Sequence, residues 1–208
     1  MSWNDLFVNM DNTNFFNFSF LPKYGSAFVR GFEYTLLLAV VSVLLAVIPA
    51  LLLAMMRLSK IKPIKWFAGA YIAVFRSTPM LVQLSIIYYG LFYAISLPRL
   101  TLFGFVDISR FIPGVVALAL NSSAYVAEIF RAGILAVDKG QAEAARSLGL
   151  SKWQSMRLVV LPQAVKNILP ALCNEFISTV KGTSLASVFF VGELMTSFKT
   201  VQSATFLA

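Results

Sequence analysis

The sequence predicts an all-α, polytopic membrane protein in which four helices cross the bilayer. Hydrophobic residues make up 59% of the 208-residue chain and charged residues only 12%, whereas a soluble domain usually carries about 25% charged residues. The apolar residues are gathered into long uncharged runs, as a bilayer requires, and the mean hydropathy is +0.79. The basic residues lie between these runs, which is typical of the loops of a multispanning protein.

Three uncharged runs are long enough to cross a hydrocarbon core of about 30 Å. They are Thr35–Met56, Ser77–Pro98 and Phe111–Ala127. Pro49 lies inside the first run, a position that membrane helices tolerate when neighbouring groups satisfy the freed carbonyl. The apolar stretch Trp66–Phe75 precedes the second run, and it fits either an interfacial helix or the first turns of that span.

Two later apolar stretches are weaker because charged residues interrupt them. Leu158–Val180 contains Lys166 and Glu175, and we expect it to form the fourth span. The second stretch, Ser184–Phe198, contains Glu193 and is short for a helix that must cross the whole hydrocarbon core. We therefore expect only a short C-terminal segment there.

The distribution of lysine and arginine predicts the orientation of the spans. Residues 57–76 contain five basic residues, and so do residues 131–157, whereas the loop over residues 98–110 contains two. The positive-inside bias places the two richer segments in the cytoplasm and the N-terminus outside. We therefore expect an extracellular or periplasmic lead over residues 1–27 and a transmembrane domain over residues 28–208.

Composition argues against several classes of function. The net charge of +8 fits basic cytoplasmic loops better than a nucleic-acid surface, because the basic residues do not follow one polar face. The chain has no histidine and one cysteine, which excludes an internal disulfide, a Cys/His metal site and a histidine-dependent catalytic triad. No G-x-x-x-x-G-K-[ST] sequence occurs, so the chain is not expected to hydrolyse ATP. We expect a non-catalytic protein without cofactor or metal.

The predicted cytoplasmic segment over residues 138–152 is typical of a short helix, a glycine stop and a second helix. Asp138 is suited to cap the first helix, in which Ala, Glu and Arg are strong helix formers. Gly149 is suited to end that helix in a left-handed conformation, and Ser151 to cap the next one. Such an element fits either a solvated loop helix or a docking element for a partner, and composition leaves both open.

Three parts of this region resemble the EAA loop of ABC importer permeases: Glu143-Ala144-Ala145, then Gly149, then Leu161-Pro162. They have the family's spacing and lie on the predicted cytoplasmic side, between two spans. The resemblance implies that this loop engages a separate ATPase. The residues that it assigns to ATPase coupling are Gly140, Glu143, Ala144, Ala145, Gly149, Leu161 and Pro162.

Further motifs resemble the permeases for polar amino acids, of the histidine, arginine and glutamine type. They lie between about Arg57 and Phe206, in the segments Phe75–Pro79, Asn121–Arg131, Gly140-Gln141, Asn174-Glu175 and Lys181–Leu185. In the last of these, Gly182 replaces the more usual aspartate. The resemblance implies the helix bundle of a type I ABC importer transmembrane domain, in the cytoplasmic (inner) membrane of a bacterium.

The resemblance also implies partners and a further helix. Such a subunit works with a second permease subunit, identical or different, a cytoplasmic ABC ATPase dimer and an extracellular or periplasmic solute-binding protein. One permease then rocks against the other to give alternating access. Family members have one more transmembrane helix near the C-terminus, whereas this chain stops at Ala208. A fifth span is therefore expected to be missing, and the natural subunit to be longer.

Polar residues inside the predicted spans are the candidates for binding the amino acid, because ionisable groups in a membrane are costly and usually face the bundle interior. Glu175, beside Asn174 in the fourth span, is suited either to pair with Lys181 or another cation or to serve as a counter-charge for the substrate's amino group. Some family members place a substrate-contacting carboxylate at this position. An acidic side chain here favours a cationic or neutral polar amino acid over an acidic one.

Four further candidates are hydroxyl and amide residues. Asn121 and Ser122 in the third span are suited either to bind a zwitterion or to form hydrogen bonds between helices. Thr183 and Ser184 are suited to cap the segment that follows, where free N–H groups would hold a substrate carboxylate.

Glu128 and Arg131 are spaced i, i+3 near the cytoplasmic end of the third span, which predicts an intrahelical ion pair, with a gating pair as the alternative. The main rival function is an ATP-independent secondary carrier or channel, which would explain the spans but not the EAA-like loop. A permease for another substrate class, such as sulfur compounds or opines, would share most of the motifs. A membrane-bound enzyme is disfavoured because no carboxylates are clustered.

Overall fold

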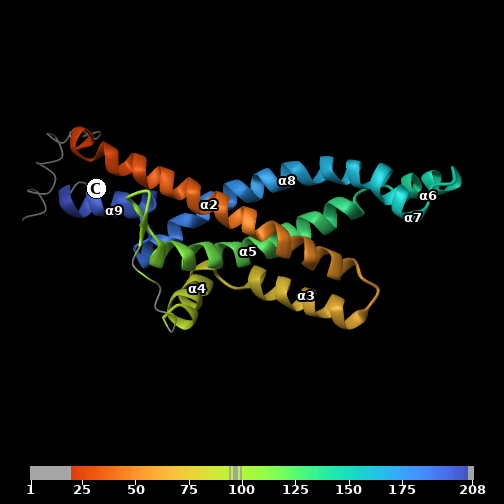
Figure 1. The fold of residues 1–208 in the computed structure, drawn as a ribbon, viewed down its shortest axis with the longest axis horizontal. Helices are drawn as coiled ribbons and strands as arrows, with labels where there is room; N and C mark the ends of the chain where they lie inside the picture. The colour runs from red at the N-terminus through yellow and green to blue at the C-terminus, as the bar shows by residue number, and fades with distance from the viewer. Residues whose placement is uncertain (1–19, 94, 96–97, 99, 206–208) are drawn as a thin grey trace, which may run out of the picture.

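The chain forms an elongated helical bundle (Figure 1) in a computed structural model that describes residues 20–205 apart from 94, 96–97 and 99. Most of the predicted N-terminal lead therefore lies outside the described residues. The elements in chain order are α2 (Leu21–Leu58), α3 (Lys62–Ser77), α4 (Met80–Ser85), η1 (Ile86–Leu91), β1 (Thr101–Leu102), β2 (Val106–Asp107), α5 (Ile108–Leu135), α6 (Lys139–Ser147), α7 (Lys152–Ser155), η2 (Met156–Val160), α8 (Leu161–Gly182), η3 (Thr183–Phe189) and α9 (Leu194–Thr205). The two short strands pair antiparallel and form a hairpin before α5.

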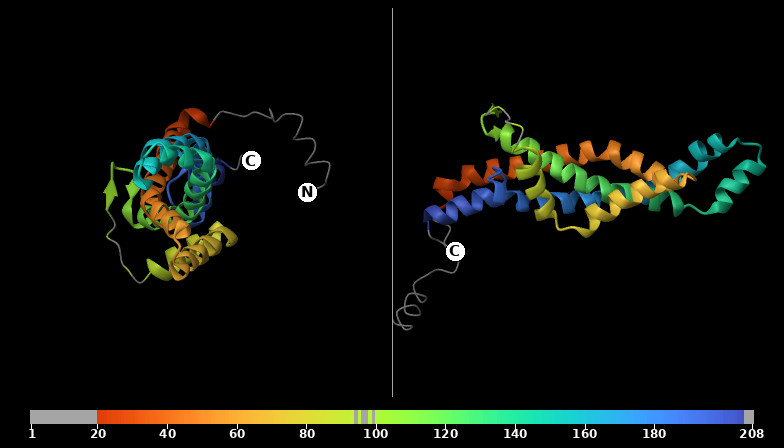
Figure 2. Two further views of the ribbon diagram at one scale, coloured as in Figure 1. Left: turned by 90° about the vertical axis from the view of Figure 1, so that its right-hand side faces the viewer. Right: turned by 90° about the horizontal axis from the view of Figure 1, so that it is seen from below.

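The described helices confirm the all-α, multispanning class that the sequence predicts. Three of them are long and apolar enough to cross a membrane: α2, α5 and the continuous run Lys152–Phe189. A fourth span is present if α3 is counted together with Met80–Leu91, although these two helices meet at a bend of 106°. Figure 2 shows α3 and α4 against one side of the bundle, while Figure 1 shows α6 and α7 at one end of it.

The second predicted span, Ser77–Pro98, differs from the structure in its bounds, because the helices found there are Lys62–Ser77 and Met80–Leu91. Trp66–Phe75 belongs to α3, which begins at Lys62 and packs against α2 and α5. The helix ends at Ser77, and Thr78 is extended with φ −99° and ψ 142°. This conformation follows from the next residue, Pro79, because a proline disfavours the helical conformation at the position before it.

The fourth span is longer than the predicted Leu158–Val180, because α8 continues directly into η3 and the helical run reaches Phe189. The predicted short segment Ser184–Phe198 is therefore divided between two elements. Its first part extends the fourth helical run, whereas its second part lies in α9. Phe190, with φ 55° and ψ 33°, makes the break between them.

Glu193, the charge that interrupts this apolar stretch, holds the start of α9. Its buried carboxylate accepts hydrogen bonds from the backbone N–H groups of Met195 and Thr196, both at 2.7 Å. The N–H of Leu194 donates to Thr35 Oγ1 on α2 at 3.0 Å. A buried carboxylate at a helix N-terminus thus satisfies donors that have no partner within the helix.

A stripe of small residues on α2 permits close packing at the centre of the bundle. Ser42, Ala46, Ala50 and Ala54 recur every four residues and are all buried. Ala50 belongs to a core cluster that joins α2 to α5 and α3. Small side chains at such an interface let helix backbones approach closely, which is the main source of helix association in a membrane. The opposite face of α2 exposes large apolar residues, as a lipid-facing surface does: Leu44, Leu45, Ile48, Leu51, Leu52 and Met55.

The contact between α5 and α8 near the α6 end depends on a glycine. A Cβ atom at Gly133 would overlap the side chain of Ile168 and lie 3.4 Å from the carbonyl oxygen of Ala164. Ile168 and Ala164 are both buried in a core cluster with Val137 and Val160. The two helices therefore meet here at a distance that only glycine allows.

Gly133→Ala is expected to destabilise the protein by about 1–3 kcal/mol, the usual cost of overpacking a close contact. The measurement is thermal unfolding of the purified protein in detergent. Gly25→Ala is the matched control, because a Cβ atom at Gly25 on α2 meets nothing within 4 Å. Equal melting temperatures for both variants would contradict the close contact between α5 and α8.

Candidate functional site: two cavities and a helical loop

A cavity of about 420 Å³ lies in the middle of the bundle, between α4, α5 and α8, and we call it the midbundle cavity. Its lining residues are Met80, Leu118, Asn121, Tyr125, Asn174, Glu175, Ser178, Thr179, Gly182 and Leu185. The volume lies within the range of about 300–1,000 Å³ that small-molecule sites occupy. The wall therefore brings together three of the predicted residues: the amides Asn121 and Asn174 and the carboxylate Glu175. Hydroxyl groups on the same wall come from Ser178 and Thr179.

Glu175 is positioned on this wall by hydrogen bonds to one of its two oxygens. Ser122 Oγ on α5 donates to Glu175 Oε1 at 3.0 Å, and Thr179 Oγ1 donates to the same oxygen at 3.5 Å. Ser122 itself is buried, so it supports the carboxylate from behind. The predicted alternative, an ion pair with Lys181 or another cation, does not form among the described residues.

Asn121 has a structural partner that the sequence analysis missed. Its Nδ2 donates to Gln83 Oε1 on α4 at 2.9 Å and to the carbonyl oxygen of Phe75 at 3.3 Å. Gln83 is buried, and its Nε2 donates to the carbonyl oxygen of Phe75 at 2.9 Å and to Thr78 Oγ1 at 2.7 Å. These bonds satisfy carbonyls that the break before Pro79 leaves free, and they attach the bend to α5. In the sequence, the one signal for this contact was Gln83 itself, a single amide side chain within the apolar run Ser77–Pro98.

Thr183 and Ser184 do not form the cap that the sequence predicts. Thr183 Oγ1 donates to the carbonyl oxygen of Val180 at 2.8 Å, and Ser184 Oγ donates to that of Lys181 at 2.7 Å. Because η3 continues α8 without a break, no new helix N-terminus with free N–H groups begins at these residues. Neither side chain belongs to the lining of the midbundle cavity.

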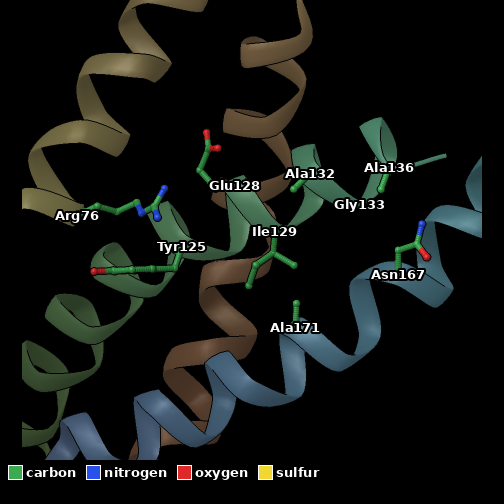
Figure 3. Close-up of a pocket in the computed structure, with 9 residues that line it drawn as sticks. All are labelled: Arg76, Tyr125, Glu128, Ile129, Ala132, Gly133, Ala136, Asn167 and Ala171. Carbon is green, nitrogen blue, oxygen red and sulfur yellow. The ribbon is translucent and has the colours of Figure 1, made fainter. Parts of the chain in front are cut away.

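A second cavity, of about 470 Å³, lies closer to α6, and we call it the α6-side cavity. Its lining residues are Arg76, Tyr125, Glu128, Ile129, Ala132, Gly133, Ala136, Asn167 and Ala171 (Figure 3). Glu128 Oε2 accepts from Arg131 Nη2 at 2.7 Å, which confirms the predicted intrahelical ion pair. Arg57 Nε at the end of α2 lies 3.6 Å from Glu128 Oε1, so this carboxylate also joins two helices.

The α6–α7 element, residues 138–155, has the local structure that the sequence predicts. Asp138 Oδ1 accepts from the N–H of Gly140 at 2.6 Å, and the side chains of Ser151 and Gln154 form a capping box at α7. Gly149 has a φ of 88°. The N–H of Leu150 bonds to the carbonyl of Ala145 at 3.2 Å, which completes a helix stop that favours glycine.

The α6–α7 element presents an exposed surface beyond the bundle while remaining attached to α8. Glu143, Ala144 and Leu148 are exposed, whereas Ala145 is buried. Leu161 and Pro162 are exposed at the first turn of α8. Gln163 Nε2 on α8 donates to Gln141 Oε1 on α6 at 3.3 Å. The predicted coupling residues therefore lie in or next to α6 and α7, which form one end of the molecule (Figure 1).

The described residues offer no metal centre, since they contain no group of three or more His, Cys, Asp or Glu side chains placed to hold an ion. The polar and charged side chains that line the two cavities are suited to hydrogen bonding and charge recognition.

Comparisons with known proteins show the family to which the chain belongs. Residues 24–206 match the family model of the binding-protein-dependent transport system inner membrane component. The chain is 42% identical over 178 residues to the arginine transport system permease protein ArtQ of Bacillus subtilis (strain 168), covering 86% of this chain and 77% of that protein. It is 38% identical over 192 residues to the putative glutamine transport system permease protein GlnP of Rickettsia bellii (strain RML369-C), covering 91% and 84%.

A solved structure is also similar. It is the crystal structure of an amino acid ABC transporter with histidines, one chain of which is 47% identical, with a TM-score of 0.81 and coverage of 92% of this chain and 85% of that one. The chain therefore belongs to the family of binding-protein-dependent transport system inner membrane components, the permease subunits of ABC transporters. The type I transmembrane fold expected from the motifs is confirmed.

Gln83→Leu is expected to destabilise the bend between α3 and α4 by about 1–3 kcal/mol, because the hydrogen bonds of the Gln83 amide to Phe75, Thr78 and Asn121 would be lost. The measurement is thermal unfolding in detergent. Gln202→Leu, at an exposed position on α9, is the control and is expected to change the melting temperature little. If the two substitutions have the same effect, Gln83 does not hold the bend.

Proposed function

We propose that the chain is the permease subunit of an ATP-driven importer for a cationic or neutral polar amino acid. The observation that carries the proposal is the Glu175 carboxylate on the wall of the midbundle cavity, which has hydroxyl partners and no cationic one among the described residues. A cationic or zwitterionic amino acid would supply the missing positive charge. The relatives named for arginine and glutamine transport support this substrate class.

The midbundle cavity would offer the substrate a carboxylate and two amides. Glu175 would hold the amino or cationic group, because an unpaired carboxylate inside a membrane is costly until a cation joins it. Asn174 lies beside it on the lining, and Asn121 offers its amide from α5. Ser122 acts through Glu175 by fixing one carboxylate oxygen. Thr183 and Ser184 do not line this cavity, so we assign them no direct part in the binding.

The α6–α7 element would dock on a cytoplasmic ABC ATPase dimer, with the N-terminus of the chain outside. Its exposed surface around Glu143, the glycine stop at Gly149 and the hydrogen bond from Gln163 to Gln141 support this role. Movement of the docked element would be passed directly to α5 and α8, which flank it in the chain. A second permease subunit and a solute-binding protein would complete the transporter, which would work by alternating access.

Glu175→Gln is expected to lower uptake of arginine by about tenfold or more, because a hydrogen bond to a charged group contributes about 1.5–3 kcal/mol. Uptake of glutamine, which has no side-chain cation, is expected to fall less. The measurement is ATP-driven uptake of each labelled amino acid by proteoliposomes that contain the whole transporter. Glu33→Gln, at an exposed carboxylate on α2, is the control. Unchanged uptake of both amino acids would remove Glu175 from the binding site.

Gly149→Glu is expected to abolish substrate-stimulated ATPase activity, because a side chain at φ 88° is strained and a new charge would alter the docking surface. Gly104→Glu is the matched control, since Gly104 also has a positive φ, of 75°, and open space around it, but lies in the β-hairpin. Full stimulation in Gly149→Glu would contradict docking at α6. Uptake that continues without ATP hydrolysis in the unmodified transporter would instead favour a secondary carrier.

A further inference from the structure

Tyr125 on α5 lines both cavities. It belongs to the wall of the midbundle cavity, together with Glu175, and to the wall of the α6-side cavity, together with Glu128. Its chain neighbours Ala124 and Val126 are completely buried in the core between helices, whereas Tyr125 is only partly buried and faces the cavities. The side chain thus lies at the division between two spaces that follow one another along α5 and α8.

Arg76 at the end of α3 lies over the Tyr125 ring. The centre of its guanidinium group is 5.2 Å from the ring centroid, which is a cation–π contact. In Figure 3 the Arg76 side chain extends from α3 toward Tyr125, while Asn167 and Ala171 lie on the opposite helix, α8. Arg76 also lines the α6-side cavity together with Glu128, so its positive charge belongs to the wall on that side of Tyr125.

We propose that Tyr125, held by Arg76, is the barrier that closes the midbundle cavity toward the α6 end of the permease. The proposal rests on the proposed function, since it assigns a step to the same transport path. A substrate bound at Glu175 must pass the Tyr125 ring to reach the α6-side cavity. Arg76 holds the ring in place, and its positive charge repels a cationic substrate at the division.

The bend between α3 and α4 is the element that would open this barrier. Arg76 lies in the last turn of α3, directly before the break at Thr78 and Pro79. Gln83 attaches the bend to Asn121, which lies one helical turn before Tyr125 on α5. A shift of the bend would therefore withdraw the guanidinium group from the ring. Tyr125 could then rotate aside without any change in the backbone of α5.

The test uses the complete transporter, with its ATPase and solute-binding protein, in proteoliposomes preloaded with labelled arginine or glutamine. Tyr125→Ala is expected to release the label about tenfold faster without ATP, the fold-change that corresponds to a lost contact of about 1–2 kcal/mol. The number of amino acids imported per ATP hydrolysed is expected to fall as well. Tyr125→Phe keeps the ring face and is expected to restore the barrier.

Tyr24→Ala is the matched control for loss of a tyrosine under a cation, because Lys23 Nζ lies 5.1 Å from the Tyr24 ring centroid at the far end of α2. It is expected to cause no leak. Arg76→Gln removes the cation while leaving the Tyr125 ring, and since Arg76 is exposed this variant is expected to fold. It should leak at a rate between those of the unmodified protein and Tyr125→Ala.

The outcomes separate this proposal from the proposed function. If the unmodified transporter imports neither amino acid with ATP, the proposed function is overturned. If it imports with ATP while Tyr125→Ala and Arg76→Gln both retain the label, the barrier is overturned and the proposed function stands. Should Tyr125→Ala fail to assemble, the Arg76→Gln measurement decides: a leak that exceeds the Tyr24→Ala control supports the barrier, and a tight vesicle overturns it.

Discussion

The close approach of α2 to α5 is the contact on which the rest of the bundle depends. In a membrane, helices gain little by hiding apolar side chains from one another, because lipid is equally apolar. Association must instead come from dispersion contacts and hydrogen bonds between closely packed helices. The buried stripe of small residues from Ser42 to Ala54 permits that close packing. With α2 fixed in this way, α3 packs against the same core, and Arg57 at the end of α2 reaches Glu128 on α5.

The bend between α3 and α4 shows how polar groups serve the architecture and the cavity together. A break in a membrane helix frees carbonyls that have no water to bind, so a partner must be found within the protein. Gln83 is that partner, and its bond from Asn121 also fixes one wall of the midbundle cavity. The shape of the candidate site is thus determined partly by the need to satisfy the backbone beside it.

Local signals in the sequence predicted the parts of the molecule that local physics decides. Asp138, Gly149 and Ser151 act on N–H and carbonyl groups a few residues away, so their caps and stop could be predicted before any fold was known. Glu175 was recognised because a charge inside an apolar run is costly. The contacts of Tyr125 could not be predicted in this way, because they join residues of α3, α5 and α8 that only the packing brings together. The cap predicted at Thr183 failed because α8 does not end there.

The separation of the midbundle cavity from the α6–α7 element has a consequence for how such proteins diversify. The cavity is lined by residues of α4, α5, α8 and η3, and this lining has no residue in common with residues 138–155. Substitutions that reshape the cavity therefore leave the chemistry of the terminal surface unaltered. Under the proposed function, a change of cargo and a change of docking surface would therefore fall on different residues, so duplicated copies could exchange cargo without a new motor for each.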